Sequence, residues 1–187
     1  RGFAANPQLV LDFYNMRRKD VAAAQPNAAH TILAQLEKEY NVTIVTQNID
    51  DLHERAGSTK VCHLHGEIFK MRSAINDELI SEIRDDIQLG QLAPDGAQLR
   101  PHIVWFEEPV PMIETAAEIA ANADVYVSAD FKYHEFFDAD SRIMIADIGH
   151  YESEQYTIEL ISDLLMKKFA TFAVHLSKIN TNPINYL

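Results

Sequence analysis

Hydrophobic and polar positions along the chain follow two alternating patterns, which together predict an α/β fold. Apolar residues at helical spacing predict helices over about residues 6–20, 27–40, 109–122 and 150–168. Short runs rich in β-branched residues predict strands near residues 42–46, 61–64, 102–105, 124–129, 142–147 and 172–178. Because helices separate most of these strands, we expect a mixed, mainly parallel sheet with helices on both faces.

The predicted helices carry the start signals and apolar stripes of helices that pack on a core. Asn6 is suited to cap the first helix, with Pro7 at its first position. The second helix has an apolar stripe at Ile32, Leu33 and Leu36. The last helix has a stripe at Ile158, Ile161, Leu164 and Leu165. We expect both stripes to be buried.

Composition and charge narrow the class of protein. The 187 residues suit one domain or a little more, and 47% hydrophobic with 24% charged residues is an ordinary globular composition. The net charge of −12 makes nucleic acid an unfavourable partner. We expect no membrane association, because no signal peptide and no apolar run of bilayer length occurs. The chain starts at Arg1 rather than Met, so we expect further sequence upstream.

The single cysteine, Cys62, excludes an internal disulfide and any zinc site built from several thiolates. A lone thiol fits a reducing compartment, which predicts a cytoplasmic location.

A polar cluster begins at the carboxyl end of the strand predicted over 42–46. Residues 46–66 read T-Q-N-I-D-D-L-H-E-R-A-G-S-T-K-V-C-H-L-H-G. Ligands bind outside the carboxyl ends of strands in open α/β sheets, so Gln47, Asn48 and Asp50 are candidate ligand contacts. The alternative is an Asx-type turn that leads into a short helix. A lone histidine in such a place is more often a packed or surface residue.

This cluster resembles the signature of the sirtuins, the NAD-dependent protein-lysine deacylases. The string Q-N-I-D-x-L-H-x-R-A-G is followed at the family's interval by H-L-H-G, and R-P-H-I-V-W-F-E-E at 100–108 resembles the family's R-P-x-I-V-W-F-G-E. The resemblance covers about residues 1–127. It implies a Rossmann-like core, NAD as the cofactor, and an acyl-lysine protein or peptide as the substrate.

The sirtuin resemblance also assigns roles to the polar cluster. It implies that Gln47, Asn48 and Asp50 face the nicotinamide and its ribose, and that His65 is the general base. In the family's reaction the acyl-lysine oxygen attacks the nicotinamide ribose, after which a ribose hydroxyl loses a proton. A neutral histidine takes up such a proton at physiological pH, typically contributing about 10²- to 10⁴-fold. We expect His63 to support the strand.

Two residues of the first helix are candidate contacts for the acyl group. Tyr14 and Arg17 lie three residues apart and are therefore neighbours on a helix. In one sirtuin branch such a pair binds the carboxylate of succinyl- or malonyl-lysine, which a guanidinium and a phenol can clamp together. A surface tyrosine packed on an arginine stem is the alternative, so deacetylase and desuccinylase activities both stay open.

The second string implies a binding strand for the substrate peptide. By the resemblance, Val104, Trp105 and Phe106 hold the peptide through backbone hydrogen bonds. The alternative is a buried strand. Glu107 stands where the family has glycine, so we expect that any positive-φ conformation or close approach there is compromised.

Two parts of the sirtuin pattern are missing from the sequence. Residues 73–98 carry no cysteine pairs, so we expect no zinc and a metal-free insert that forms a solvated lid or loop. The six glycines are all isolated, so no glycine-rich loop for the NAD phosphates is predicted.

From about residue 127 to the end the chain resembles the C-terminal part of the Nif-three-like dinuclear-metal family, often labelled GTP cyclohydrolase type two. The G-H-Y-E-S-E element at 149–154 puts His150 and Glu154 four apart on one helix face. By the resemblance they form half of a two-metal site, and a divalent metal is expected there. The alternative is a helix-start glutamate beside a capping histidine. Because strand 124–129 fits both resemblances, we place the domains at 1–127 and 128–187 without a linker.

Three functions stay open from the sequence. The first is an NAD-dependent protein-lysine deacylase that transfers the acyl group to ADP-ribose. The second is a metal-binding hydrolase-type protein that uses His150 and Glu154. The third is a non-catalytic, chimeric α/β domain. The longer resemblance favours the deacylase.

Overall fold

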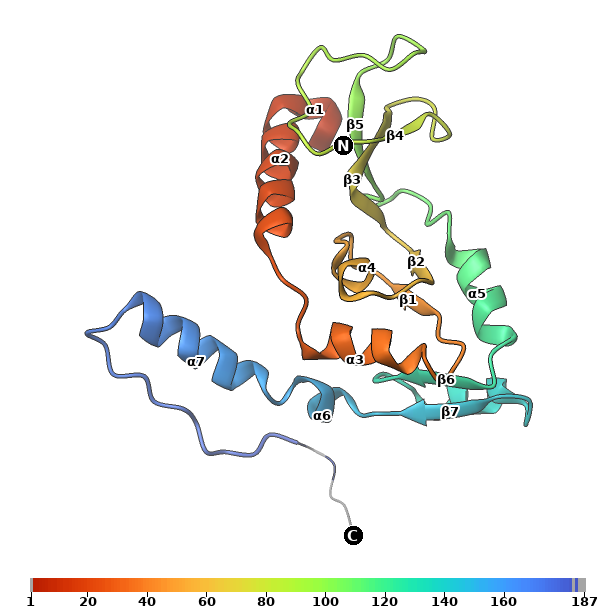
Figure 1. Cartoon of the computed structure of the whole chain (residues 1–187), viewed down its shortest axis with the longest axis vertical. Helices are drawn as coiled ribbons and strands as arrows, with labels where there is room; N and C mark the ends of the chain where they lie inside the picture. Colours follow the sequence, from red (N-terminus) through yellow and green to blue (C-terminus); the bar gives the residue numbers. More distant parts are fainter. Residues whose placement is uncertain (1, 183, 185–187) are drawn as a thin grey trace. The chain divides into compact units, whose positions relative to one another are not determined.

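The strands form three small sheets in the computed structural model, which describes residues 2–182 and 184. Two sheets are parallel pairs, β1 with β2 and β6 with β7, whereas β4, β3 and β5 form an antiparallel sheet. Helices precede, separate and follow these strands (Figure 1), although β2, β3, β4 and β5 follow one another without a helix. The mixture of helices and strands confirms the predicted α/β class. The chain divides into two units, residues 1–119 and 120–187.

Helix α2, Pro7–Ala23, is the longest helix of the first unit and follows the short α1, Gly2–Ala5. It starts as predicted: the Asn6 side chain accepts a hydrogen bond from the Leu9 N–H at 3.1 Å, and Pro7 lies in the first turn. Its buried positions recur every three or four residues, at Leu11, Asn15, Arg18 and Val21. The helix therefore buries a face that is half polar.

The two polar residues of that face bind backbone far along the chain. The Asn15 side chain accepts from the Ile87 N–H and donates to the Ile87 carbonyl, both at 3.0 Å. Arg18 donates to the carbonyls of Ile68 at 2.9 Å and Asp85 at 3.1 Å. Burial lowers the pKa of Arg18. These bonds fix α2 against the antiparallel sheet, beside which Figure 1 draws it.

The sheets of the first unit are built on short strands. Central strand β3, Gly66–Ser73, pairs with β4, Ile80–Glu82, and with β5, Leu99–Ile103. β1, Ile44–Thr46, and β2, Val61–His63, lie near helices α3, Ala28–Leu36, and α4, Leu52–Ala56 (Figure 1). One core cluster consists of Val21, Ile68, Phe69 and Ile103, with Tyr14, Ile49 and Trp105 packed against it.

The insert at 73–98 is mostly exposed, as expected of a solvated lid or loop, but it also contributes buried residues to the core. Its Ile87 is 1% exposed and joins a core cluster with Leu11, Ala93 and Leu99. The Ser73 hydroxyl also donates to Asp95 at 2.6 Å. The apolar residues within this acidic segment are spaced without helical or strand period, so the sequence pattern did not mark them as core.

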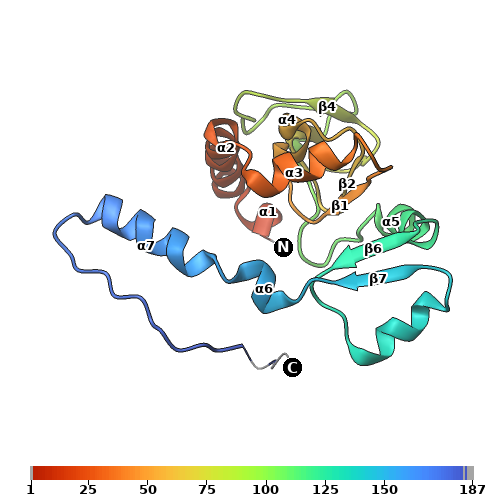
Figure 2. The ribbon, with the colours of Figure 1, turned by 60° about the horizontal axis from the view of Figure 1, so that its bottom comes forward.

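The second unit contains β6, Val125–Ser128, and β7, Met144–Asp147, which run side by side (Figure 2). Helix α5, Ile113–Ala121, leads into it. A 3₁₀ helix, η1, spans Tyr133–Ala139, and two helices follow β7: α6, His150–Glu154, and α7, Thr157–Lys168. The single helix predicted over 150–168 is thus two helices with a short break.

Three expectations about packing are wrong. No strand forms at 172–178, because this run has no pairing partner among the described residues and an unpaired run cannot form a ladder. The apolar stripe of α7 is 41–56% exposed at Leu164 and Leu165, and similarly at Ile158 and Ile161. Ile32 and Leu36 of α3 are exposed as well.

Across the described ranges, no helix has both the length and the apolar character of a membrane span.

Candidate functional site

The candidate site lies where two parallel strands end side by side. Thr46 at the end of β1 is opposite His63 at the end of β2. The Leu64 N–H donates to the Thr46 carbonyl at 2.9 Å, so the turn after β2 is bonded to the end of β1. Because the carboxyl ends of parallel strands meet at one edge, the Q-N-I-D loop and the H-L-H-G turn come together there, as the sequence predicts.

The Q-N-I-D loop turns its apolar residue inward and its polar residues outward. Ile49 packs on the core cluster, and its carbonyl accepts from the Ile68 N–H at 2.7 Å. Gln47 and Asn48 are exposed, and neither side-chain amide is hydrogen-bonded within the described part of the chain. Asp50 Oδ1 accepts from the Leu52 N–H at 3.1 Å, which is the Asx-type turn named above as the alternative.

Gly66 determines where His65 lies. It has φ = +81°, and a Cβ at this position would collide with the carbonyl oxygen of His102. Only glycine therefore lets β3 approach β5 this closely. The His65 carbonyl then accepts from the Val104 N–H at 2.9 Å. The predicted base is thus bonded to the first residue of the predicted peptide-binding segment.

His63 is held between two acceptors that sequence reasoning did not identify. Its Nδ1 lies 2.9 Å from the Asn48 carbonyl oxygen, and its Nε2 lies 2.8 Å from Glu54 Oε1. Burial acts to lower the pKa of His63, but the hydrogen bonds with Glu54 and Asn48 outweigh it and raise the pKa above its ordinary value. Because His63 and its two partners lie on a strand, a loop and a helix, no spacing in the sequence marks this cluster.

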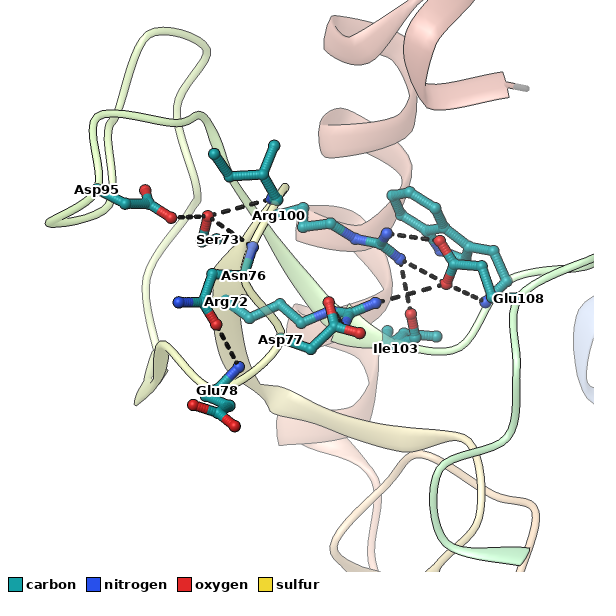
Figure 3. A network of polar contacts seen from close by, with 11 residues as sticks. Arg72, Ser73, Asn76, Asp77, Glu78, Asp95, Arg100, Ile103 and Glu108 are labelled. Carbon is teal, nitrogen blue, oxygen red and sulfur yellow. Dashed lines mark hydrogen bonds and ion pairs between the residues drawn. The ribbon is translucent and has the colours of Figure 1, made fainter.

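Glu108 organises the segment that follows β5. Its carboxylate accepts from both terminal nitrogens of Arg100, at 2.6 and 3.0 Å, and from the Trp105 N–H at 3.0 Å. Arg72 lies 3.5 Å away on its other side and also pairs with Asp77 (Figure 3). Burial acts to raise the pKa of Glu108, but the bonds from Arg100 and Trp105 and the charges of the two arginines hold it below its ordinary value.

The predicted peptide segment has some backbone groups already bonded. The N–H groups of Val104 and Trp105 donate to His65 and Glu108, and the Trp105 carbonyl accepts from the Glu108 N–H. Among the described residues, this leaves the carbonyls of Val104 and Phe106 and the Phe106 N–H for an added strand. Glu107 has φ = +72°, so the chain keeps a left-handed conformation at this position in spite of the side chain, at a cost of about 1–2 kcal/mol.

Tyr14 and Arg17 make separate contacts. The Tyr14 hydroxyl accepts from Trp105 Nε1–H at 3.0 Å, and burial raises the pKa of this phenol. The exposed Arg17 side chain lies 3.8 Å from Asp20. The guanidinium of Arg100 lies over the Trp105 ring, 3.4 Å from its centroid. Tyr14 thus contacts Trp105 of the predicted peptide segment through both a hydrogen bond and ring stacking.

In the second unit, His150 lies between two carboxylates. Its Nδ1 is 2.9 Å from Asp130 Oδ1, and its Nε2 is 3.4 Å from Glu154 Oε2. The hydrogen bond with Asp130 raises the pKa of this ring, and the charges of Asp130 and Glu154 act in the same direction. Among the residues that the structure describes, no group of three or more histidine, cysteine, aspartate or glutamate side chains could hold a metal ion.

Comparison with known proteins follows the same division of the chain. The profile of the Sir2 family matches residues 1–130. The chain belongs to the Sir2 family. A second profile, Duf34/NIF3 (NGG1p interacting factor 3), matches residues 112–183. Both sirtuin and Nif-three-like resemblances are therefore confirmed, and residues 112–130, which include β6, match both profiles.

Relatives of this Sir2 family chain carry deacylase names. The NAD-dependent protein deacylase of Helicobacter pylori is 50% identical over 126 residues, which are 67% of this chain and 55% of that protein. The NAD-dependent protein deacylase of Vibrio vulnificus is 38% identical over 195 residues, covering 95% of this chain and 76% of that protein. The chain thus spans little more than half the length of the first of these relatives.

Solved structures agree on the fold. A Sir2 homologue in an NAD complex is 32% identical with a TM-score of 0.65, covering 78% of this chain and 61% of that one. A Sir2 homologue mutant in an ADP-ribose complex is 27% identical with a TM-score of 0.62, covering 92% of this chain and 79% of that one. The Rossmann-like α/β assignment of the sequence is consistent with both.

Proposed function

We propose that this chain provides the nicotinamide end and the substrate strand of an NAD-dependent protein-lysine deacylase. One observation carries the proposal: a continuous set of hydrogen bonds joins the Q-N-I-D loop, the H-L-H-G turn and the V-W-F segment. The N–H groups of Leu64, Ile68 and Val104 donate to the carbonyls of Thr46, Ile49 and His65, respectively. The names of the relatives and the NAD complex of a homologous structure support the same function.

NAD fits one end of this site. Gln47, Asn48 and Asp50 would hold the nicotinamide and its ribose, because amides and a carboxylate pair with amide and hydroxyl groups. When bound, NAD supplies the ribose that receives the acyl group. The described residues do not fit the pyrophosphate, since the positive-φ glycines lie singly and form no phosphate-binding loop.

His65 is assigned to proton transfer. Its backbone bond to Val104 puts it at the start of the segment where an acyl-lysine peptide would pair as an added strand. The imidazole is partly exposed and has no hydrogen-bond partner among the residues described, so it is available to take a proton from a ribose hydroxyl.

Replacing this base tests the proposal. We expect His65→Ala to reduce NAD-dependent deacylation of an acetyl-lysine peptide by about 10²-fold or more. His175→Ala is the matched control, because His175 is an exposed histidine of the other unit. Mass spectrometry of the peptide measures both variants. Turnover without NAD, or equal turnover in the two variants, would contradict the proposal.

Acyl-group preference is a separate part of the proposal. We infer that Tyr14 and Arg17 clamp the carboxylate of a succinyl group, with Arg17 leaving the exposed carboxylate of Asp20 to do so. Arg17→Ala should then lower kcat/KM for a succinyl peptide by about 10-fold or more and leave an acetyl peptide nearly unaffected. Lys19→Ala, which removes a neighbouring exposed cation, is the control. Equal losses on both peptides would count against the clamp.

The remaining assignments stay predictions. We propose a cytoplasmic location, a domain border between residues 127 and 128, and an origin of the chain by fusion of two gene fragments. The second candidate function is that of a metal-binding hydrolase-type protein, in which His150 and Glu154 bind a divalent metal. Metal analysis of the purified protein, with His150→Ala as the comparison, tests it.

A further inference from the structure

His63 joins three elements of the proposed site. It ends β2 two residues before His65, and its side chain is 7% exposed. Nδ1 lies 2.9 Å from the carbonyl oxygen of Asn48 in the Q-N-I-D loop, and Nε2 lies 2.8 Å from Glu54 Oε1 in α4. The deacylase reaction as described above gives this ring no part, although it touches the loop that would hold the nicotinamide ribose.

The proton on His63 decides how many of these bonds form. A carbonyl and a carboxylate oxygen only accept hydrogen bonds, so an imidazolium donates to both. A neutral ring has one N–H, and it turns a lone pair toward the other oxygen. Loss of the proton therefore breaks one of the two contacts and replaces it with repulsion. The raised pKa of His63 agrees with this arrangement.

The charged groups around the ring support the protonated form. Helix α4 presents Glu54 and His53 to His63, and β3 presents Glu67. Both carboxylates favour the imidazolium. Burial lowers the pKa of His53, and the neighbouring His30 lowers it further. At a pH between the pKa values of His53 and His63, His53 is therefore neutral while His63 is charged.

We propose that protonated His63 is a positioning residue that holds the Asn48 carbonyl, and with it the Q-N-I-D loop, next to the turn that carries His65. The ligand in this inference rests on the proposed function, whereas the dependence of the loop on His63 stands on the contacts alone. The site then contains two histidines that act in opposite protonation states. His65 acts as a neutral base, and His63 acts as a cation. Raising the pH through the titration of His63 loosens the loop.

Glu54→Gln separates the charge from the contact. A glutamine amide can donate to Nε2, so a neutral His63 would keep both contacts in this variant. Nitrogen NMR of the full chain follows the ring, which is assigned by the signal lost in His63→Gln. We expect the titration midpoint of His63 to fall in Glu54→Gln and to stay unchanged in Glu39→Gln, which removes an exposed carboxylate elsewhere.

Backbone signals of the loop report its position. In the unmodified chain we expect the amide signals of Ile49 and Asp50 to shift with the midpoint of His63. In Glu54→Gln they should stay constant through the same pH range. Loop signals that ignore the titration of His63, or a midpoint unaltered by Glu54→Gln, would overturn the proposal.

NAD binding, measured by calorimetry on the same samples, distinguishes this inference from the proposed function. We expect the Kd for NAD to rise about tenfold across the titration of His63, and to change less in Glu54→Gln. If the loop follows His63 but NAD binds at no pH, the proposed function is wrong and the positioning of the loop by His63 stands. Equally tight NAD binding on both sides of the titration would overturn the role of His63 in the site.

Discussion

Two histidine–carboxylate clusters, one in each unit, share their chemistry and differ in burial. His63 lies between Glu54 and the Asn48 carbonyl and is 7% exposed. His150 lies between Asp130 and Glu154 and is 62% exposed. Acceptors on both ring nitrogens raise the pKa of each histidine. His63 also joins the Q-N-I-D loop, through Asn48, and helix α4, through Glu54, to strand β2.

The difference shows that burial, more than residue type, decides what such a cluster can do. Water competes for the bonds of an exposed histidine and screens its charges, so breaking them changes little. A buried ring has no such replacement, and a lost partner leaves its polar atoms unsatisfied. Burial therefore lets the first cluster control backbone position, whereas the exposed second cluster cannot.

Substitution of the glycines beside the two clusters should give the largest difference in stability between the two units. Gly66→Ala puts a Cβ against the backbone carbonyl of His102 at φ = +81°, so we expect the first unit to lose about 3 kcal/mol or more. Gly149→Ala meets chiefly the carboxylate end of Glu152, which can shift at the cost of its hydrogen bond from Asn182. There we expect a smaller loss, mainly the φ cost of about 1–2 kcal/mol.

Denaturant unfolding measures both glycine variants. Fluorescence of Trp105, the single tryptophan, reports on the first unit, and hydrogen exchange of the β6–β7 amides reports on the second. Gly96→Ala is a control for φ alone, because Gly96 has φ = +81° and open space around its Cβ. A Gly66→Ala protein as stable as Gly96→Ala would contradict the close approach of β3 and β5.

The histidines themselves should give an intermediate effect that depends on pH. Because the folded state raises the pKa of His63, its contribution is full below the unfolded value of about 6.5 and is lost as the pH rises through the folded value. His63→Ala should thus destabilise the first unit by about 1–2 kcal/mol near pH 6 and by less near pH 9. Unfolding at several pH values, followed by Trp105 fluorescence, tests this. A loss that grows with pH would show that the sign is wrong.

His150→Ala is the matched variant in the second unit. Its ring also has a raised pKa, but it is exposed, so we expect no measurable change in the exchange of the β6–β7 amides at either pH.

The smallest measurable changes in stability should come from strained backbone. Glu107→Gly should relieve the left-handed conformation at φ = +72° but also removes the contacts of the side chain, so we expect a gain below about 1 kcal/mol. Asp140→Gly, at φ = +47° in the second unit, should gain less, because aspartate tolerates this region better. Urea midpoints of both variants test the order. A loss in Glu107→Gly would mean that the side-chain contacts outweigh the strain.

Local signals in the sequence predicted the parts of the fold that depend on neighbouring residues. The Asn6 cap, strands β1 and β2, and the meeting of the Q-N-I-D loop with the H-L-H-G turn follow from spacing along the chain. Contacts between distant residues carry no such signal. Glu54 with His63, and Arg72 with Glu108, were not foreseen because each pair is defined only after the elements pack.

The burial predicted from the apolar stripes was wrong for a related reason. Helical spacing at Ile158, Ile161, Leu164 and Leu165 indicates a face that favours burial, but it says nothing of what covers that face. The reverse case is Ile87, which sits in an acidic, irregular segment and is nevertheless core. Arg18 is the extreme example, since a charged residue is seldom predicted to be 1% exposed.

The bonds of α2 set an order of events for a chain that is made from its N-terminus. Arg18 finds its backbone partners 50 and 67 residues later, and Asn15 finds its partner 72 residues later. Until Ile87 has left the ribosome, the inward face of α2 stays solvated and the first unit cannot close. A nascent chain that pauses before this point exposes a formed helix without its sheet, and it is then open to chaperones and proteases.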